Sequence, residues 1–192
     1  NFEVKPNSVF AIVGESGSGK STIAKLMAGF FDADDGRIYF GDQDVKSIPT
    51  SQLMKHVAYV AQDNFLFDTS IRENLKIAKA DATDEEIQAA LKAANCLELI
   101  ERLPEGLNSN AGDCGKFLSG GERQRITLAR AMLADAQCII LDEATAYADV
   151  ENEAKIQEAL SRLMKDKTLI VVAHRLNTIV GADQIMVLGH GK

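Results

Sequence analysis

The sequence predicts an α/β fold, in which a mostly parallel β-sheet is flanked by helices and an α-helical subdomain is inserted. Short apolar runs alternate with segments whose apolar residues recur at helical spacing, which is typical of a parallel sheet covered on both faces. A glycine-rich stretch joins the first such run to the first helical segment. A long helical stretch then interrupts the alternation. We therefore predict one domain, with an α/β core at residues 1–69 and 136–192 and a helical subdomain at 70–135.

Individual elements follow from the same periodicity. The expected strands are residues 9–13, 37–40, 57–61, 138–141, 168–173 and 184–188. The expected helices are residues 22–30, 83–94, 97–103, 119–133, 150–164 and 176–180. Thr83 and Glu86 have the spacing of a capping box, which predicts where the second of these helices begins. Residues 106–117 are rich in glycine, asparagine and aspartate without periodicity, so we expect a loop there.

Composition limits the classes of protein to consider. The chain has 192 residues, of which 46% are apolar, enough for a hydrophobic core. Its net charge of −7 argues against a surface built mainly to hold nucleic acid. No apolar run approaches the roughly 18 to 20 residues of a membrane span, and no signal-peptide pattern opens the chain. Both ends lie close to expected strands, so we expect a piece of a longer protein.

The three cysteines do not form a metal motif. Cys96, Cys114 and Cys138 are odd in number and too far apart for a zinc knuckle. We expect them to be buried free thiols in a reducing compartment.

The glycine-rich stretch fits the pattern G-x-x-x-x-G-K-[ST] of a phosphate-binding loop. The stretch lies between an expected strand and an expected helix, which is the context that this motif requires. Glycines let the backbone turn tightly and aim N–H groups at an anion, next to the positive end of the helix. Lys20 can reach the β- and γ-phosphates, and the Ser21 hydroxyl can bind Mg²⁺. The predicted nucleotide-binding residues here are Gly14, Glu15, Ser16, Gly17, Ser18, Gly19, Lys20, Ser21 and Thr22.

Two acidic residues follow the apolar run at 138–141. An acidic residue at the carboxyl end of a strand in an open α/β sheet points into the ligand crevice. Asp142 can hold Mg²⁺ directly or through water, and Glu143 can orient and deprotonate an attacking water. Together with the phosphate-binding loop, the pair predicts a site of nucleotide hydrolysis.

A second phosphate-capable helix start is predicted about a hundred residues after the first. Ser119 is a good N-cap, but Gly120 and Gly121 in the first turn cost up to about 1 kcal/mol each relative to alanine. Close approach of an anion to bare backbone would offset that cost. The alternative is a loop with a Gly-Gly hinge.

The ordered motifs together resemble the ATPase domains of ABC transporters over essentially the whole chain. Leu118 to Glu122 resembles the family's signature motif. The other matches are Gln62 with the Q-loop, residues 138–143 with Walker B, residues 146–149 with the D-loop and His174 with the switch histidine.

The resemblance implies roles that the residues alone do not show. It implies ATP and Mg²⁺ as cofactors and a head-to-tail pair of such domains, identical or different, with ATP at the interface. Signature residues Ser119, Gly120, Gly121 and Glu122 would then contact nucleotide bound by the partner, and Asp149 would cross the interface. The catalytic set would be Lys20, Gln62, Glu143 and His174, and the Mg²⁺ set would be Ser21, Gln62 and Asp142.

Two further segments, residues 67–75 and 112–115, resemble exporter-type members of the family. The resemblance implies a transmembrane domain, fused N-terminally, that contacts the Gln62–Asn74 and Asp113 regions. It also implies ATP-driven transport, a place on the cytoplasmic face of a membrane and no nucleic-acid partner. The chain departs from the family pattern at residues 146–148, 113 and 114, and it lacks the upstream aromatic residue that stacks on adenine.

Two other classes of protein share parts of this pattern. A soluble ABC ATPase acting on nucleic acid or the ribosome is one alternative; the DNA-repair relatives, however, insert a long coiled coil where this chain has only residues 63–117. A P-loop kinase or GTPase is the other, and the signature-like segment argues against it.

Overall fold

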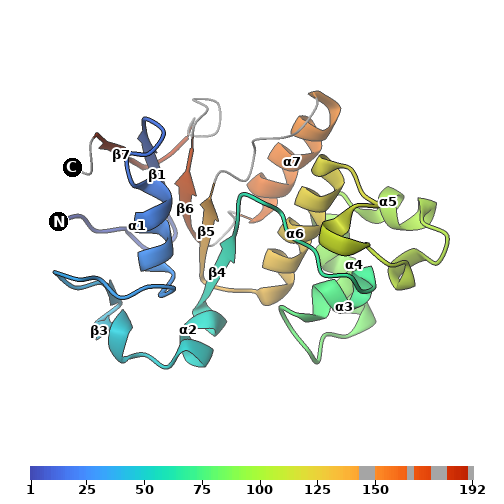
Figure 1. Ribbon diagram of the computed structural model, residues 1–192, viewed down its shortest axis with the longest axis horizontal. Helices are drawn as coiled ribbons and strands as arrows, with labels where there is room; N and C mark the ends of the chain where they lie inside the picture. The colour runs from blue at the N-terminus through green and yellow to red at the C-terminus, as the bar shows by residue number, and fades with distance from the viewer. Residues whose placement is uncertain (143–149, 164–166, 174–180, 190–192) are drawn as a thin grey trace. The chain divides into compact units, whose positions relative to one another are not determined.

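The computed structural model describes residues 1–142, 150–163, 167–173 and 181–189 (Figure 1). Within these ranges the main sheet has five strands in the order β4-β5-β6-β1-β7. Their bounds are β1 Val9–Gly14, β4 Val57–Val60, β5 Cys138–Asp142, β6 Thr168–Val172 and β7 Gln184–Leu188. The pairs β5–β6, β6–β1 and β1–β7 are parallel, which confirms the predicted α/β class.

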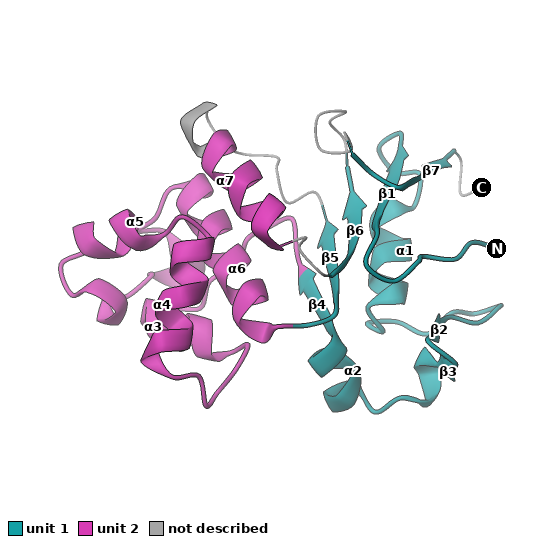
Figure 2. Ribbon diagram, turned by 180° about the vertical axis from the view of Figure 1, so that it is seen from behind, with its two compact units in different colours: residues 1–59, 136–143, 166–192 teal, residues 60–135, 144–165 magenta. Residues whose placement is uncertain are grey.

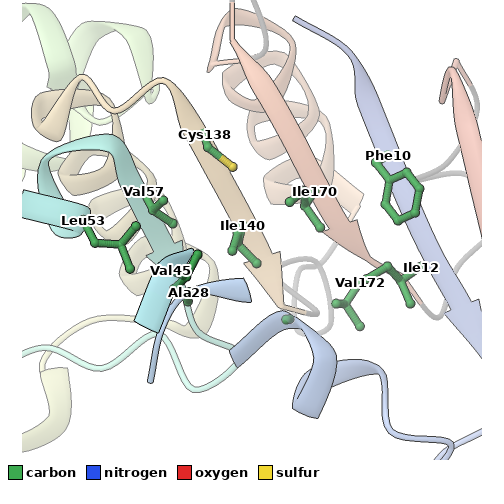
Figure 3. Close-up of a cluster of buried hydrophobic side chains, with 11 residues drawn as sticks. Phe10, Ile12, Ala28, Val45, Leu53, Val57, Cys138, Ile140, Ile170 and Val172 are labelled. Carbon is green, nitrogen blue, oxygen red and sulfur yellow. The ribbon is translucent and has the colours of Figure 1, made fainter. Parts of the chain in front are cut away.

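Successive residues of the central strands face opposite sides of the sheet, and both sides are buried, which explains why these strands are continuous apolar runs in the sequence. Phe10 and Ile12 of β1 belong to one buried cluster with Cys138 and Ile140 of β5 and Ile170 and Val172 of β6 (Figure 3). The residue between them, Ala11, is also buried, as are Leu141 and Val171 at the matching places of the two other strands. Both faces of the sheet are therefore covered, as expected for strands made almost wholly of apolar residues.

The segment after the first helix differs from the prediction. Helix α1 spans Lys20–Met27 and therefore ends before residue 30. Gly29, just after its C-cap, has φ of 72°. Only Tyr39–Phe40 of the predicted strand at 37–40 is extended; this β2 pairs with β3, Gln43–Asp44, in a separate antiparallel ribbon. A helix that the periodicity did not reveal, α2 at Thr50–His56, buries Leu53 in the cluster of Figure 3.

Five helices occupy the described chain from residue 71 to residue 163. They are α3 Ile71–Lys76, α4 Asp84–Ala93, α5 Leu97–Arg102, α6 Gly120–Ala134 and α7 Val150–Leu163. Helix α4 begins with the predicted capping box, in which Thr83 and Glu86 each accept a backbone N–H of the other. The predicted loop contains two single turns, Gly106–Asn108 and Asp113–Gly115. The predicted helix at 176–180 lies outside the described residues, and no described helix is long and apolar enough to cross a bilayer.

The chain forms two compact units, coloured separately in Figure 2. Unit 1 comprises residues 1–59, 136–143 and 166–192, and unit 2 comprises residues 60–135 and 144–165. Residues 60–69 and 144–165 thus belong to the helical unit by compactness, although the sequence-based division assigns them to the α/β core. Within unit 2, Arg162 of α7 donates to the carbonyls of Lys92 and Ala93 at the end of α4, both at 3.1 Å. Arg162 therefore caps the C-terminal end of α4, and this contact groups α7 with the helices of unit 2.

Thiol labelling should distinguish the three cysteines. Contrary to the expectation of three buried thiols, Cys114 is exposed, while Cys96 and Cys138 are buried. Burial raises the pKa of Cys96 to about 12 and that of Cys138 to about 11. At pH 8 their thiolate fractions fall to about 10⁻³ or less. We expect a maleimide to modify Cys114 alone in the native protein and all three after denaturation, as counted by mass spectrometry of this segment. Rapid native labelling of Cys96 would contradict the fold.

Candidate functional site

The phosphate-binding loop joins β1 to α1 through a chain of tight turns. Ser18 donates its backbone N–H to the Glu15 carbonyl at 3.2 Å, so the loop closes on itself. Gly19, the N-cap of α1, has φ of 100° and ψ of 8°, a left-handed conformation that costs other residues about 1–2 kcal/mol. The glycine therefore lets the first N–H groups of α1 face the inside of the loop.

Gly14 is required for a different reason, the close approach of a neighbouring strand. It ends β1 beside Leu188, its partner in β7. A Cβ atom at Gly14 would lie 2.1 Å from the Leu188 carbonyl oxygen and 2.9 Å from Ser18 Oγ. Any larger residue would push β7 away or reshape the loop, so the strand pairing and the loop depend on the same glycine.

Lys20 folds back over the loop that precedes it. Its side chain is buried, and its Nζ atom donates to the carbonyls of Gly14 at 3.0 Å and Glu15 at 2.9 Å. An ammonium has three N–H donors. Within the described residues these two carbonyls fix the charge over the mouth of the loop and leave one donor for an incoming anion.

Ser21 and Asp142 come together although 121 positions separate them in the chain. Ser21 Oγ donates to Asp142 Oδ1 at 2.8 Å, and Tyr59 Oη donates to Asp142 Oδ2 at 2.6 Å. The carboxylate is buried at the end of β5, and the ring of Tyr59 is held by Phe30, edge to face at 4.9 Å. Two of the predicted Mg²⁺ ligands thus form one cluster of oxygen atoms, the kind of ligand that Mg²⁺ prefers.

The loop also holds a buried polar atom that has no partner in the described chain. Ser18 Oγ is enclosed and makes no hydrogen bond there. A buried hydroxyl usually has a partner, and its absence calls for an explanation. A phosphate oxygen inside the loop would supply an acceptor for this hydroxyl, for Lys20 and for the N–H groups at the start of α1. The donors of the loop and the oxygen pair of Ser21 and Asp142 therefore fit a nucleotide phosphate with its Mg²⁺.

Gln62 belongs to unit 2 and follows β4. The side chain of Gln62 is exposed. Its backbone carbonyl accepts a hydrogen bond from Asn64 Nδ2 at 3.2 Å. Asn64 is buried, adopts φ of 48° and accepts from Thr127 Oγ1 of α6 at 3.0 Å. The segment after Gln62 is therefore fastened to the helix that begins at the signature motif.

Asn74 holds the next part of this segment. It is fully buried, donates to the carbonyls of Phe67 at 3.0 Å and Ser70 at 3.1 Å, and accepts the Phe67 N–H at 2.9 Å. Arg130 of α6 donates to Asn74 Oδ1 at 3.0 Å and to the Phe65 carbonyl at 3.3 Å. Burial lowers the pKa of Arg130 without removing its charge. Sequence reasoning did not single out Arg130, because only the fold brings it to Asn74.

Two segments predicted to contact a transmembrane domain lie side by side in unit 2. Ile71 donates to the Ser109 carbonyl at 3.0 Å, and Ala111 donates to the Thr69 carbonyl at 2.9 Å. These bonds place the loop that carries Asp113 alongside the end of the Gln62–Asn74 region. The large apolar side chains exposed on these segments are Phe65, Phe67 and Phe117.

The signature motif begins α6 with a second capping box. Ser119 Oγ accepts the Glu122 N–H at 3.3 Å, and Glu122 Oε2 accepts the Ser119 N–H at 2.8 Å. The Arg102 guanidinium at the end of α5 donates to Glu122 Oε1. Burial alone would raise the pKa of Glu122, but the Ser119 N–H and Arg102 more than offset it and lower that pKa. Glu122 is therefore an anion at neutral pH. The predicted helix start at Ser119 is confirmed, and the alternative of a loop with a Gly-Gly hinge is wrong.

Several predicted residues lie outside the described part of the chain. They are Glu143, Ala146, Tyr147, Ala148, Asp149 and His174. Tyr59 was missed at the sequence level. The signal that could have found it is its position at the end of an apolar run, because neighbouring parallel strands end at the same edge of a sheet.

Known proteins resemble this chain over its whole length. It is 47% identical to the heavy metal tolerance protein of Schizosaccharomyces pombe over 192 residues, which is 100% of this chain and 23% of that protein. It is equally identical to the mycobactin import ATP-binding/permease protein of Mycolicibacterium smegmatis, covering 100% of this chain and 22% of that protein. The chain thus spans about a quarter of the length of these relatives.

The fold matches that of a bacterial Atm1-family ABC exporter solved with ATP bound. The TM-score is 0.92 at 39% sequence identity, and the match covers 99% of this chain and 33% of the exporter chain. The predicted ABC-type P-loop fold is therefore confirmed. The family model described as ABC transporter matches residues 1–146, well over half of the chain, and the chain accordingly belongs to the ABC transporter family.

Proposed function

We propose that this chain is the ATP-binding and ATP-hydrolysing motor domain of an exporter-type ABC membrane transporter. The observation that carries the proposal is the 2.8 Å contact between Ser21 Oγ and Asp142 Oδ1. It joins the end of a phosphate-binding loop to the end of a buried strand, so that one Mg²⁺ can bind both and a phosphate at once. Membership of the ABC transporter family supports ATP as the nucleotide.

Each residue of the site has a proposed task. The loop from Gly14 to Thr22 cradles the phosphates, with Lys20 on the β- and γ-phosphates. Ser21, Asp142 and Gln62 hold or sense Mg²⁺, which neutralises charge on the phosphates when bound. Glu143 takes the proton of the attacking water, and His174 hydrogen-bonds the γ-phosphate.

The signature motif serves a second copy of the domain in this proposal. The N–H groups at the start of α6, with Ser119, Gly120, Gly121 and Glu122, complete a site whose phosphate loop belongs to the partner. Two ATP molecules then lie between two domains arranged head to tail.

A transmembrane domain is the proposed partner of the aromatic surface on unit 2. Phe65 and Phe67 pack edge to face with ring centroids 4.9 Å apart, yet both remain exposed. Exposed aromatic side chains are enriched at interfaces between proteins. Relatives several times longer than this chain, one of them named as an ATP-binding/permease protein, support such a domain on the same polypeptide and a place on the cytoplasmic face of a membrane. They also disfavour the alternative of a soluble ATPase acting on nucleic acid or the ribosome.

Magnesium dependence tests the proposal in the full-length protein. We expect ATP hydrolysis to stop when EDTA removes Mg²⁺ and to return when Mg²⁺ is restored, because the Ser21–Asp142 oxygen pair needs the ion to bind phosphate. Ser21→Ala should raise the Mg²⁺ concentration for half-maximal activity by at least about tenfold. Ser47→Ala, which removes another hydroxyl of unit 1 that only accompanies a surface turn, is the control. Hydrolysis unaffected by EDTA would exclude this function.

A further inference from the structure

The first turn of α6 contains a carboxylate, which is unfavourable at a helix end that is to bind phosphate. Glu122 is the third residue of the helix, and its carboxylate turns back onto the Ser119 N–H at 2.8 Å. The N-terminus of a helix acts as roughly half a positive charge. One carboxylate at that end weakens the attraction of the helix end for a γ-phosphate, although Arg123 also lies there and donates to the Leu118 carbonyl at 2.7 Å.

Arg102 lies on the other oxygen of the same carboxylate. The guanidinium comes from the last turn of α5 and donates to Glu122 Oε1, while Oε2 remains on the N-cap. About two thirds of the Arg102 side chain is exposed, so it contributes little to packing, whereas Glu122 is mostly covered. With Arg102 in place, the charge of Glu122 is offset, and the side-chain charges at the helix end, Arg123 included, favour an anion together with the positive end of the helix.

Helix α4 shows the same arrangement without the phosphate-binding features. Its capping glutamate, Glu86, accepts from the Thr83 N–H at 3.0 Å and pairs with Lys79 at 2.5 Å. Its first turn, however, also contains Asp84 and Glu85, and Arg72 pairs with Asp84, so two cations face three carboxylates. The first turn of α6 has two glycines in those places. A glutamate–cation pair thus occurs at both helices, but only at α6 does it leave the helix end free of net negative charge.

We propose that Arg102 is a positioning residue that offsets the charge of Glu122 and so lets the start of α6 accept the γ-phosphate of ATP bound by the partner domain. The inference rests on the proposed function, because the signature motif must face nucleotide for the charge to matter. It assigns to Arg102 a role in ATP affinity through another residue, without contact with the nucleotide.

Charge-balance rescue in the full-length protein tests the proposal. At low ionic strength we expect Arg102→Ala to raise the ATP concentration for half-maximal hydrolysis about two- to fivefold. The double variant Arg102→Ala/Glu122→Gln has the parent's local charge and a glutamine that still suits a capping box, so it should return to within about 1.5-fold of the parent. The increase should shrink in about 0.5 M NaCl because exposed charges are screened. Inhibition by ADP, which lacks the γ-phosphate, should not change.

Lys79→Ala is the matched control, because it removes the same kind of partner from the capping glutamate of α4. Both single variants should lower Tm by similar small amounts, but only Arg102→Ala should shift the ATP dependence. A parental ATP dependence for Arg102→Ala, or a defect that Glu122→Gln does not rescue, would overturn the role of Arg102. A parent protein with no Mg²⁺-dependent ATP hydrolysis would instead overturn the proposed function itself.

Discussion

Replacing Glu143 with glutamine is expected to lower the rate of ATP hydrolysis by about 10²- to 10⁴-fold, or roughly 3 to 5.5 kcal/mol in the barrier. Glutamine keeps the size and polarity of the side chain but cannot accept the proton of the attacking water. The contacts of Lys20, Ser21 and Asp142 remain, so ATP should still bind. The measurement is ATP affinity and single-turnover hydrolysis in the full-length protein.

Asp142→Asn is the informative comparison, because this residue is proposed to act on Mg²⁺ rather than on water. Both of its carboxylate oxygens accept hydroxyl hydrogen bonds, from Ser21 and from Tyr59. An amide NH₂ in place of one oxygen would face a hydroxyl that now donates, and it binds Mg²⁺ poorly. We expect weaker Mg²⁺ and ATP binding from this variant. Near-normal hydrolysis by Glu143→Gln would move the general base elsewhere, with His174 the next candidate.

Lys20→Ala is expected to abolish turnover and to weaken or misplace bound ATP. The buried ammonium is held on the carbonyls of Gly14 and Glu15, so it is positioned over the loop before nucleotide arrives. A preorganised charge of this kind contributes at least about 10²-fold to the rate. Hydrolysis and ATP affinity should both be measured, because a purely catalytic lysine would change only the first.

Lys25→Ala supplies the control on the same helix. Lys25 lies in the last turn of α1, at the end away from the loop, and should tolerate the change with hydrolysis within about twofold of the parent. Circular dichroism should show that both lysine variants fold. Parental hydrolysis by Lys20→Ala would mean that the assigned phosphate site is wrong.

The features that could be predicted from the sequence are those set by neighbouring residues. The loop from Gly14 to Ser21 needs glycine backbone and a following helix, all within one short stretch. Both capping boxes depend on residues three positions apart, so Thr83 and Ser119 could each be placed at a helix start. Buried strands such as β5 are recognisable because both of their faces are apolar.

Features that depend on a neighbour far along the chain could not be predicted in this way. A short strand such as β2 is defined by its partner, so the run at 37–40 looked longer than it is. Cys114 lies at the surface in a turn with φ of 52°, whereas burial was expected as the default for a free thiol.

The sequence by itself therefore determined the family, the fold class and the residues with the chemistry for nucleotide binding, because each motif is local and the motifs come in a characteristic order. Only the tertiary structure decided which residues surround them. Tyr59 reaches Asp142, Arg130 reaches Asn74 and Arg102 reaches Glu122 across 83, 56 and 20 positions respectively. Such pairs arise when strands and helices pack, and hydrogen-bond geometry then selects partners that no spacing rule encodes.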